Sequence, residues 1–262
     1  MKSFCIALAL CSGFVHAQTQ VHVKNFNFSY QNPHGQGEAT SFSRSKSTTS
    51  DSVNVSVDKI DQEFHIQVTG GEEHEFIFKD APSFMTDAET INLSGFNLDL
   101  NDQLNLKVSS ARFNSHSDSL QLDGLTLACQ KLGVEENLMD QLISGCVQKM
   151  SFKSSKFSSQ NSDALIASAL DEMMAGIGVN SVDFAINNGK FDLSAEVKAQ
   201  ISGKVKSSGN MSYDSVTGKL SVKISEVKFG FLNITSKVFD ELKKQESDRL
   251  TVKAPYVYLL VK

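Results

Sequence analysis

The sequence predicts a mostly β protein of the α+β class, in which long, curved antiparallel meanders carry two to three amphipathic helices packed on the sheet. Two observations predict this fold. Apolar and polar residues alternate with a period of two along most of the chain, and turn dipeptides such as Asn188-Gly189 separate the alternating runs. With 262 residues, 40% of them hydrophobic and 21% charged, the chain can bury a sizeable core.

The clearest alternation surrounds Asn188-Gly189. Apolar residues occupy even positions over 182–186, and every odd position over 191–205 is apolar or small. Asn-Gly is typical of a type I′ hairpin turn, which predicts Ile186 opposite Phe191. We expect residues 191–205 to form a single strand of about fifteen residues, far above the usual length. Its small residues, Gly203 among them, would leave space for a helix or an acyl chain.

The same meander continues toward the C-terminus. Alternation predicts that Met211 pairs with Val222 and that Ser225-Glu226 is a β-bulge, because the parity of the apolar positions shifts there. The apolar positions after the bulge are Val227, Phe229 and Phe231. The sheet formed by this meander should have one apolar face and one face exposed to solvent.

The first half of the chain shows a similar pattern. Leucine-rich alternation over 91–127 predicts a meander, and a hairpin is expected over 64–78. The Ser/Thr-rich residues 33–52 indicate a loop or a frayed edge. Helical spacing of apolar residues appears at 135–144, 162–176 and 235–244.

These elements suggest two halves. Residues 18–150 form a β-rich half with a helix bracketed by cysteines, and residues 151–262 form a helix followed by the long meander; the two halves could also be one continuous domain. Residues 1–17 have the basic start, apolar run and Val15-His16-Ala17 cleavage site of a signal peptide. An alternative is a lipoprotein signal acylated at Cys11. The expected location is the periplasm, with secretion or the outer surface as alternatives.

Charge and length of apolar runs exclude several partners. The signal contains Lys2 and no acid, so the mature chain keeps 24 of the 25 basic residues against all 30 acidic ones. That balance argues against nucleic acid and against anionic membrane surfaces as partners. No later run reaches the ~20 apolar residues of a spanning helix, so no transmembrane segment is expected in the mature chain.

Two cysteines remain after the signal, Cys129 and Cys146. In an oxidising compartment this isolated pair predicts a disulfide bond. A metal site or a nucleophilic thiol is the rival interpretation, and it has neither a nearby His nor a CxxC spacing to support it.

The search for catalytic chemistry is negative, and we expect no enzyme activity, no cofactor and no metal site. GxSxG, HExxH and P-loop motifs are absent from the sequence. His65 and His74, with the acidic residues around them, could suggest a metal, but the expected hairpin register turns the two imidazoles to opposite faces. His34 and Glu38 lie in the polar stretch, where a metal or sugar contact is the minor alternative to a solvated loop.

The segment 184–261 resembles bacterial envelope proteins of the tubular lipid-binding (TULIP) or AsmA-like type. The resemblance is carried by the Asn188-Gly189-Lys190-Phe191 hairpin, the return strand at 209–213, the strand at 218–222, and the final strand after Val252-x-x-Pro255. In such families a curved antiparallel sheet wraps a helix and encloses an apolar groove for lipid tails.

The signal and the missing catalytic motifs predict an exported, non-enzymatic protein, and the resemblance implies that it binds lipid or another apolar ligand between curved sheet and helix. The alternative is a structural or protein-interaction module of the cell envelope, with an envelope protein as partner. The residues expected to line the groove are apolar residues of the second meander and of the helix at 162–176: Met173, Met174, Phe184, Phe191, Val197, Ile201, Met211, Val222 and Phe229.

Overall fold

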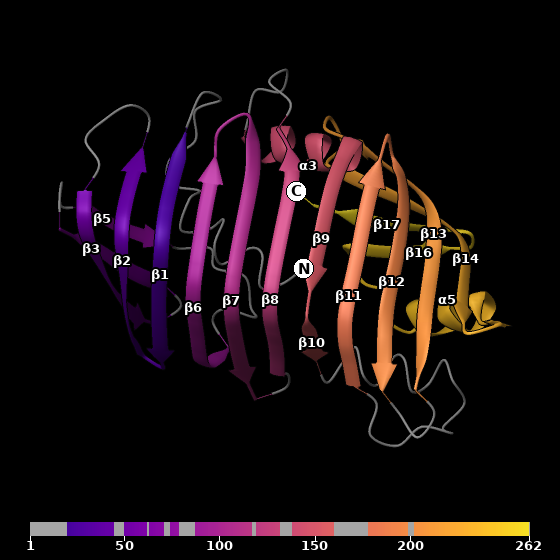
Figure 1. Ribbon diagram of the computed structural model, residues 1–262, viewed down its shortest axis with the longest axis horizontal. Coiled ribbons are helices and arrows are strands. Elements are labelled where there is room, and N and C mark those ends of the chain that lie inside the picture. The colour runs from indigo at the N-terminus through magenta and orange to yellow at the C-terminus, as the bar shows by residue number, and fades with distance from the viewer. Residues whose placement is uncertain are drawn as a thin grey trace. The chain divides into compact units, whose positions relative to one another are not determined.

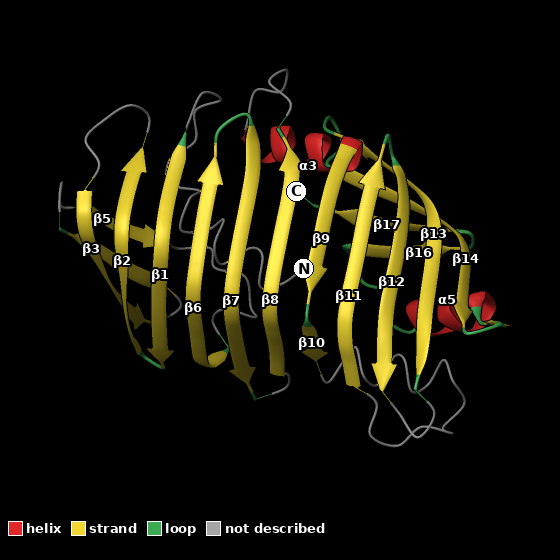
Figure 2. Cartoon of the chain, viewed as in Figure 1, coloured by secondary structure: helices red, strands yellow, loops and turns green. Residues whose placement is uncertain are grey.

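The structure is a computed structural model, and it describes residues 20–44, 50–61, 63–70, 74–78, 87–116, 119–131, 138–159, 178–198 and 202–261. The chain divides into two compact units, Met1–Leu125 and Thr126–Lys262. Nearly all described residues lie in antiparallel strands, which confirms the predicted β class (Figure 2). The described part contains two helices; the signal peptide expected at 1–17 and the helix expected at 162–176 lie outside it.

The strands of the first unit pair in the order β5-β4-β3-β2-β1-β6-β7, each antiparallel to its neighbours. The boundary between the units falls within β8 (Ser119–Gln130). The other strands are β1 (Val21–Gln31), β2 (His34–Arg44), β3 (Ser50–Ile60), β4 (Glu63–Thr69), β5 (His74–Phe78), β6 (Ala88–Leu100) and β7 (Gln103–Ser115).

The sheet of the first unit curls back on itself, and β5 passes behind β1 and β2 in Figure 1. One core cluster joins Tyr30 of β1, Ile91 of β6 and Phe113 of β7 to Val57 of β3 and Phe64 of β4. Because these strands lie at separate places in the sheet, their side chains can meet only if the sheet is strongly curved.

The prediction of a loop over 33–52 is wrong, because β2 occupies most of it and pairs with β1 on one side and β3 on the other. Phe42 is the only large apolar residue of β2, and the glycines near its start have a packing reason. A Cβ on Gly35 would lie 2.9 Å from the Phe28 ring, and one on Gly37 would lie 2.8 Å from the Phe26 ring. The rings of β1 therefore cover the glycines of β2.

The strands of the second unit pair in the order β8-β9-β11-β12-β13-β14-β17-β16, again antiparallel. Two short strands attach to it: β10 pairs with β11, and β15 pairs with the end of β14. Their bounds are β9 (Lys149–Ser154), β10 (Lys156–Ser159), β11 (Gly178–Asn187), β12 (Lys190–Lys198), β13 (Gly203–Asp214), β14 (Lys219–Phe229), β15 (Leu232–Asn233), β16 (Leu250–Lys253) and β17 (Tyr256–Leu260).

The predicted long strand over 191–205 is wrong. It is a hairpin in which β12 ends at Lys198, β13 begins at Gly203, and Val197 pairs with Gly203. Odd-numbered residues of β12 pair with odd-numbered residues of β13. The alternation of apolar and polar residues therefore continues from one strand into the next and gives no sign that the chain reverses direction. The intervening residues also contain no Gly, Pro, Asn or Asp to signal a turn.

The other registers of this meander are confirmed. Asn188 and Gly189 have φ values of 50° and 74°, as a type I′ turn requires, and Ile186 pairs with Phe191. Met211 pairs with Val222, and the register shifts by one residue at Ser225. The turn dipeptide and the parity shift in the sequence therefore mark real features.

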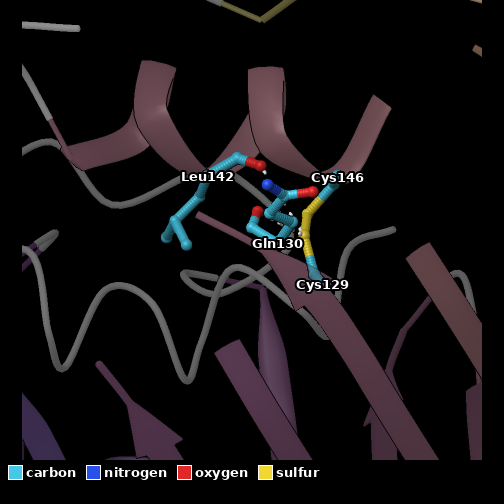
Figure 3. The surroundings of a disulfide bond; sticks show 4 residues. All are labelled: Cys129, Gln130, Leu142 and Cys146. Atoms are coloured by element: carbon cyan, nitrogen blue, oxygen red, sulfur yellow. Dashed lines mark hydrogen bonds between the residues drawn. A yellow bond between two sulfur atoms is a disulfide. The ribbon is translucent and has the colours of Figure 1, made fainter. Parts of the chain in front are cut away.

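Two helices pack on the second unit, α3 (Leu138–Gln148) and α5 (Thr235–Lys243). The disulfide between Cys129 and Cys146 ties α3 to the end of β8, with the two Cα atoms 4.8 Å apart (Figure 3). Neither described helix combines the length and apolar character needed to cross a membrane.

Candidate functional site

The candidate site is the apolar face of the second unit's sheet that carries both helices, which we call the inner face. Register places its side chains in cross-strand rows that run over β9, β11, β12, β13, β14 and β17. The rows consist of Phe152, Phe184 and Leu193; of Ile186, Phe191 and Ile224; and of Met211, Val222 and Val257.

The helix α3 bounds one end of the inner face. The backbone N–H of Gly189 donates to the carbonyl of Val147 at 3.0 Å, so the β11-β12 turn is fixed to the end of α3. The hydroxyl of Tyr213, on β13, donates to the carboxylate of the buried Asp140 on α3. These polar contacts hold the helix at the rim and leave the rows between the helices apolar.

The helix α5 bounds the opposite end. A core cluster joins Val197, Val227 and Phe229 of the sheet to Ile234 and Val238 at the start of α5. Val197 and Phe229 are only 2% and 8% exposed. These two predicted groove residues therefore lie in the core under α5.

Aromatic rings occupy the places where the sheet has no side chain. A Cβ on Gly203 would lie 2.4 Å from the Phe229 ring, and a Cβ on Gly209 would lie 2.6 Å from the Phe191 ring. The space that the sequence leaves beside Gly203 is thus filled by Phe229. The ring of Phe184 lies 5.8 Å from that of Phe191 and extends the aromatic layer.

Between the two helices the inner face is covered only in part. Phe184, Met211 and Val222, three of the residues predicted to line a groove, are half-buried, as are Phe152 and Val257. Met173, Met174 and Ile201 lie outside the described residues. The rows contain no ionisable side chain, so this surface offers dispersion contacts and burial from water, with no acid or base for chemistry.

Two depressions are lined mostly by polar residues. One of about 490 Å³ in the first unit is lined mostly by amides and hydroxyls, including Asn27, Gln36 and Asn92, with Glu38 as its carboxylate. One of about 240 Å³ in the second unit is lined by Asn210, Met211, Ser212, Ser221, Lys223 and Tyr256. Of the half-buried inner-face residues, only Met211 borders either depression.

The register of β4 and β5 is the one predicted for the histidine-containing hairpin. His65 pairs with Ile77 and His74 with Val68, as the predicted hairpin register requires. The Nδ1 atom of His34 lies 2.7 Å from a carboxylate oxygen of Asp58, in an exposed pair across β2 and β3. Within the described ranges no three His, Cys, Asp or Glu side chains gather closely enough to hold a metal.

Sequence reasoning missed one surface feature. Phe231 was expected on the apolar face after Phe229, but it lies in the turn between β14 and β15 and is 91% exposed. Gly230, with a φ of 59°, is the signal that the strand ends there. Comparison with protein-family models, with curated proteins and with solved structures finds no match to this chain.

Proposed function

We propose that the second unit binds a lipid acyl chain or another apolar ligand on the inner face between α3 and α5, as an exported, periplasmic, non-enzymatic carrier. The observation that carries the proposal is the continuity of the half-buried rows, in which Phe184, Met211 and Val222 meet neighbours on adjoining strands. Contiguous apolar surface that stays partly exposed on a sheet face typically serves a ligand or a partner.

The energetic argument favours a flexible apolar chain. Covering apolar surface is worth about 2.5 kcal/mol for roughly every 100 Å² removed from water. This gain does not depend on hydrogen bonds. The side chains of the inner-face rows offer none, so an apolar ligand suits them. Met211 is an unbranched, adaptable side chain and can adjust to chains of different shape.

The first experiment asks whether a ligand accompanies the protein. The purified full chain is extracted with organic solvent, and the extract is compared by mass spectrometry with that of an unrelated exported protein prepared identically. We expect a stoichiometric lipid or other apolar molecule. Extracts indistinguishable from the control would contradict the carrier and favour the structural or interaction module.

A second experiment locates the ligand. The chain has no tryptophan, so Phe184→Trp introduces a single fluorescent reporter on the inner face. Tyr256→Trp is the matched control. Tyr256 is exposed and precedes Val257 on β17, and because Val257 faces the inner face, Tyr256 points to the opposite face. A brominated fatty acid should quench the first variant several-fold more strongly than the second. Equal quenching would place the ligand elsewhere.

A further inference from the structure

Two apolar side chains are exposed to solvent where the turn after β14 leads into β15. Phe231 is 91% exposed and Leu232 is 52% exposed, and they are adjacent in the chain. A fully exposed Phe at a turn gains nothing from folding, and exposed contiguous apolar side chains commonly mark an interaction site. We call Phe231 and Leu232 the apolar tip.

The backbone under the apolar tip is firmly held. The N–H of Gly230 donates to the carbonyl of Lys204 at 3.0 Å, and the N–H of Ile234 donates to the carbonyl of Val227 at 2.9 Å. The hydroxyl of Thr235 accepts a hydrogen bond from the N–H of Val227 at 2.8 Å. The tip is therefore fixed to the Val227–Phe229 core and needs little ordering to make a contact, which favours binding.

Two lysines lie on the strands next to the tip. Lys206 pairs in register with Lys228, and Lys228 pairs with Asn233 next to the tip. Lys228 has a carboxylate partner, the side chain of Glu226 at 2.8 Å, whereas among the described residues Lys206 has no carboxylate within ion-pair distance. The negative charge of the mature chain does not extend here, since residues 18–125 contain 7 basic and 15 acidic residues and residues 126–262 contain 17 and 15.

We propose that the apolar tip inserts into the interfacial region of an anionic lipid bilayer, with the neighbouring lysines at the headgroups. A large apolar side chain beside lysines is the composition of interfacial membrane anchors. A specific protein partner needs an interface of about 1,000 Å² or more, which the two side chains of the apolar tip cannot supply. The proposal concerns a surface outside the inner face and requires no bound ligand.

The turn at the other end of β14 provides a natural comparison. Val216 is also 91% exposed, in the turn between β13 and β14. Its N–H donates to the Asp214 carboxylate at 3.0 Å, and Thr217 donates its hydroxyl to the same carboxylate at 2.7 Å. Hydrogen bonds from Thr217 hold the pKa of Asp214 below its usual range. The positive charge of Lys219, its register partner, offsets that carboxylate. This turn therefore has no excess of positive charge to attract an anionic surface.

The test uses vesicles of phosphatidylcholine containing a minor fraction of phosphatidylglycerol. In the tryptophan-free chain, Phe231→Trp should show a blue-shifted emission and quenching by brominated lipids when vesicles are added. Val216→Trp, equally exposed at the opposite end of the strand, should show neither change. Equal responses of the two reporters, or no response of Phe231→Trp, would overturn the proposal.

A second measurement separates docking from ligand binding. Phe231→Ser should lower the vesicle partition coefficient, measured by flotation, about tenfold or more, because moving a Phe side chain from water into the bilayer is worth at least that factor. The same variant should retain any extractable ligand and an unchanged melting temperature. Vesicle binding that persists unchanged in Phe231→Ser contradicts the docking proposal. The absence of an extractable ligand from the wild-type protein contradicts only the proposed carrier function.

Discussion

Gly209 shows how a single missing side chain sets the spacing of the inner face. It lies at the bulge of β13 and β14, where Ile224 is its partner. A Cβ there would come within 1.9 Å of the Lys223 carbonyl oxygen and 2.6 Å of the Phe191 ring. Because one of these atoms belongs to the backbone, the surroundings cannot move aside cheaply.

We therefore expect Gly209→Ala to lower the free energy of unfolding by about 3 kcal/mol, at the upper end of what overpacking costs. Gly230→Ala is the control. Gly230 has a positive φ of 59° but open space around its Cα, so only the backbone strain remains, about 1 kcal/mol. Chemical denaturation of both variants measures the difference. Equal losses would mean that Phe191 does not pack against Gly209.

In the first unit, the ion pair between Arg112 and Asp123 should contribute to the loss of folding stability at acidic pH. Arg112 donates to both carboxylate oxygens of Asp123, at 2.7 and 3.3 Å, and these hydrogen bonds hold the pKa of Asp123 below its usual range. A carboxyl whose pKa is lower in the folded chain stabilises it at neutral pH. That contribution is lost as the pH falls below about 4, through the folded-state pKa.

Asp123→Asn should thus have a lower melting temperature than the wild type at neutral pH and a smaller loss on acidification from about pH 5 to 3. Thermal unfolding across that range measures both quantities. If the melting temperatures of the two proteins fell in parallel with pH, the contact with Arg112 would contribute nothing to the loss of stability in acid.

At the scale of elements, the sequence predicts hairpins well where turn chemistry and parity agree. Asn188-Gly189 fixes the pairing of Ile186 with Phe191, and the parity shift locates the bulge at Ser225. The turn between β12 and β13 has neither signal. The packing of Phe229 on Gly203 was equally beyond prediction, because it depends on the register of strands that the sequence alone does not bring together.

The same limit applies to the candidate site. Alternation identifies which side chains share the inner face, and the structure places Phe184, Met211 and Val222 on it. Alternation cannot tell which of them other side chains cover. Val197 and Phe229 have the same pattern as Met211, yet α5 buries them, since a helix that begins at Thr235 packs on only one end of the sheet.

The face assignment of β12 can be tested by two adjacent substitutions. Val197→Asp should lower the free energy of unfolding by several kcal/mol, because it places an unpaired carboxylate in a core position that is 2% exposed. Lys198→Asp, on the exposed side of the same strand, should cost little. Urea denaturation compares the two. Similar midpoints would contradict the inward orientation of Val197.

At the scale of the whole molecule, the two compact units differ in what stabilises them. The first has an aromatic core around Tyr30 and Phe64 and no cysteine outside the expected signal. The second has its core under α5 and the only disulfide of the described residues, Cys129–Cys146. Because each unit has its own core, a change in the disulfide should act mainly on the second.

Closing a loop of 17 residues stabilises a fold by about 3 kcal/mol on the chain-entropy model. Reduction should therefore raise amide hydrogen exchange in α3 and in β9 and β11, which α3 contacts, while β2, β3 and β4 keep their protection. Hydrogen exchange with and without reductant measures this, and a variant with both cysteines replaced by serine should match the reduced protein. Exchange that rises equally in β2–β4 would show that the two units unfold as one cooperative body.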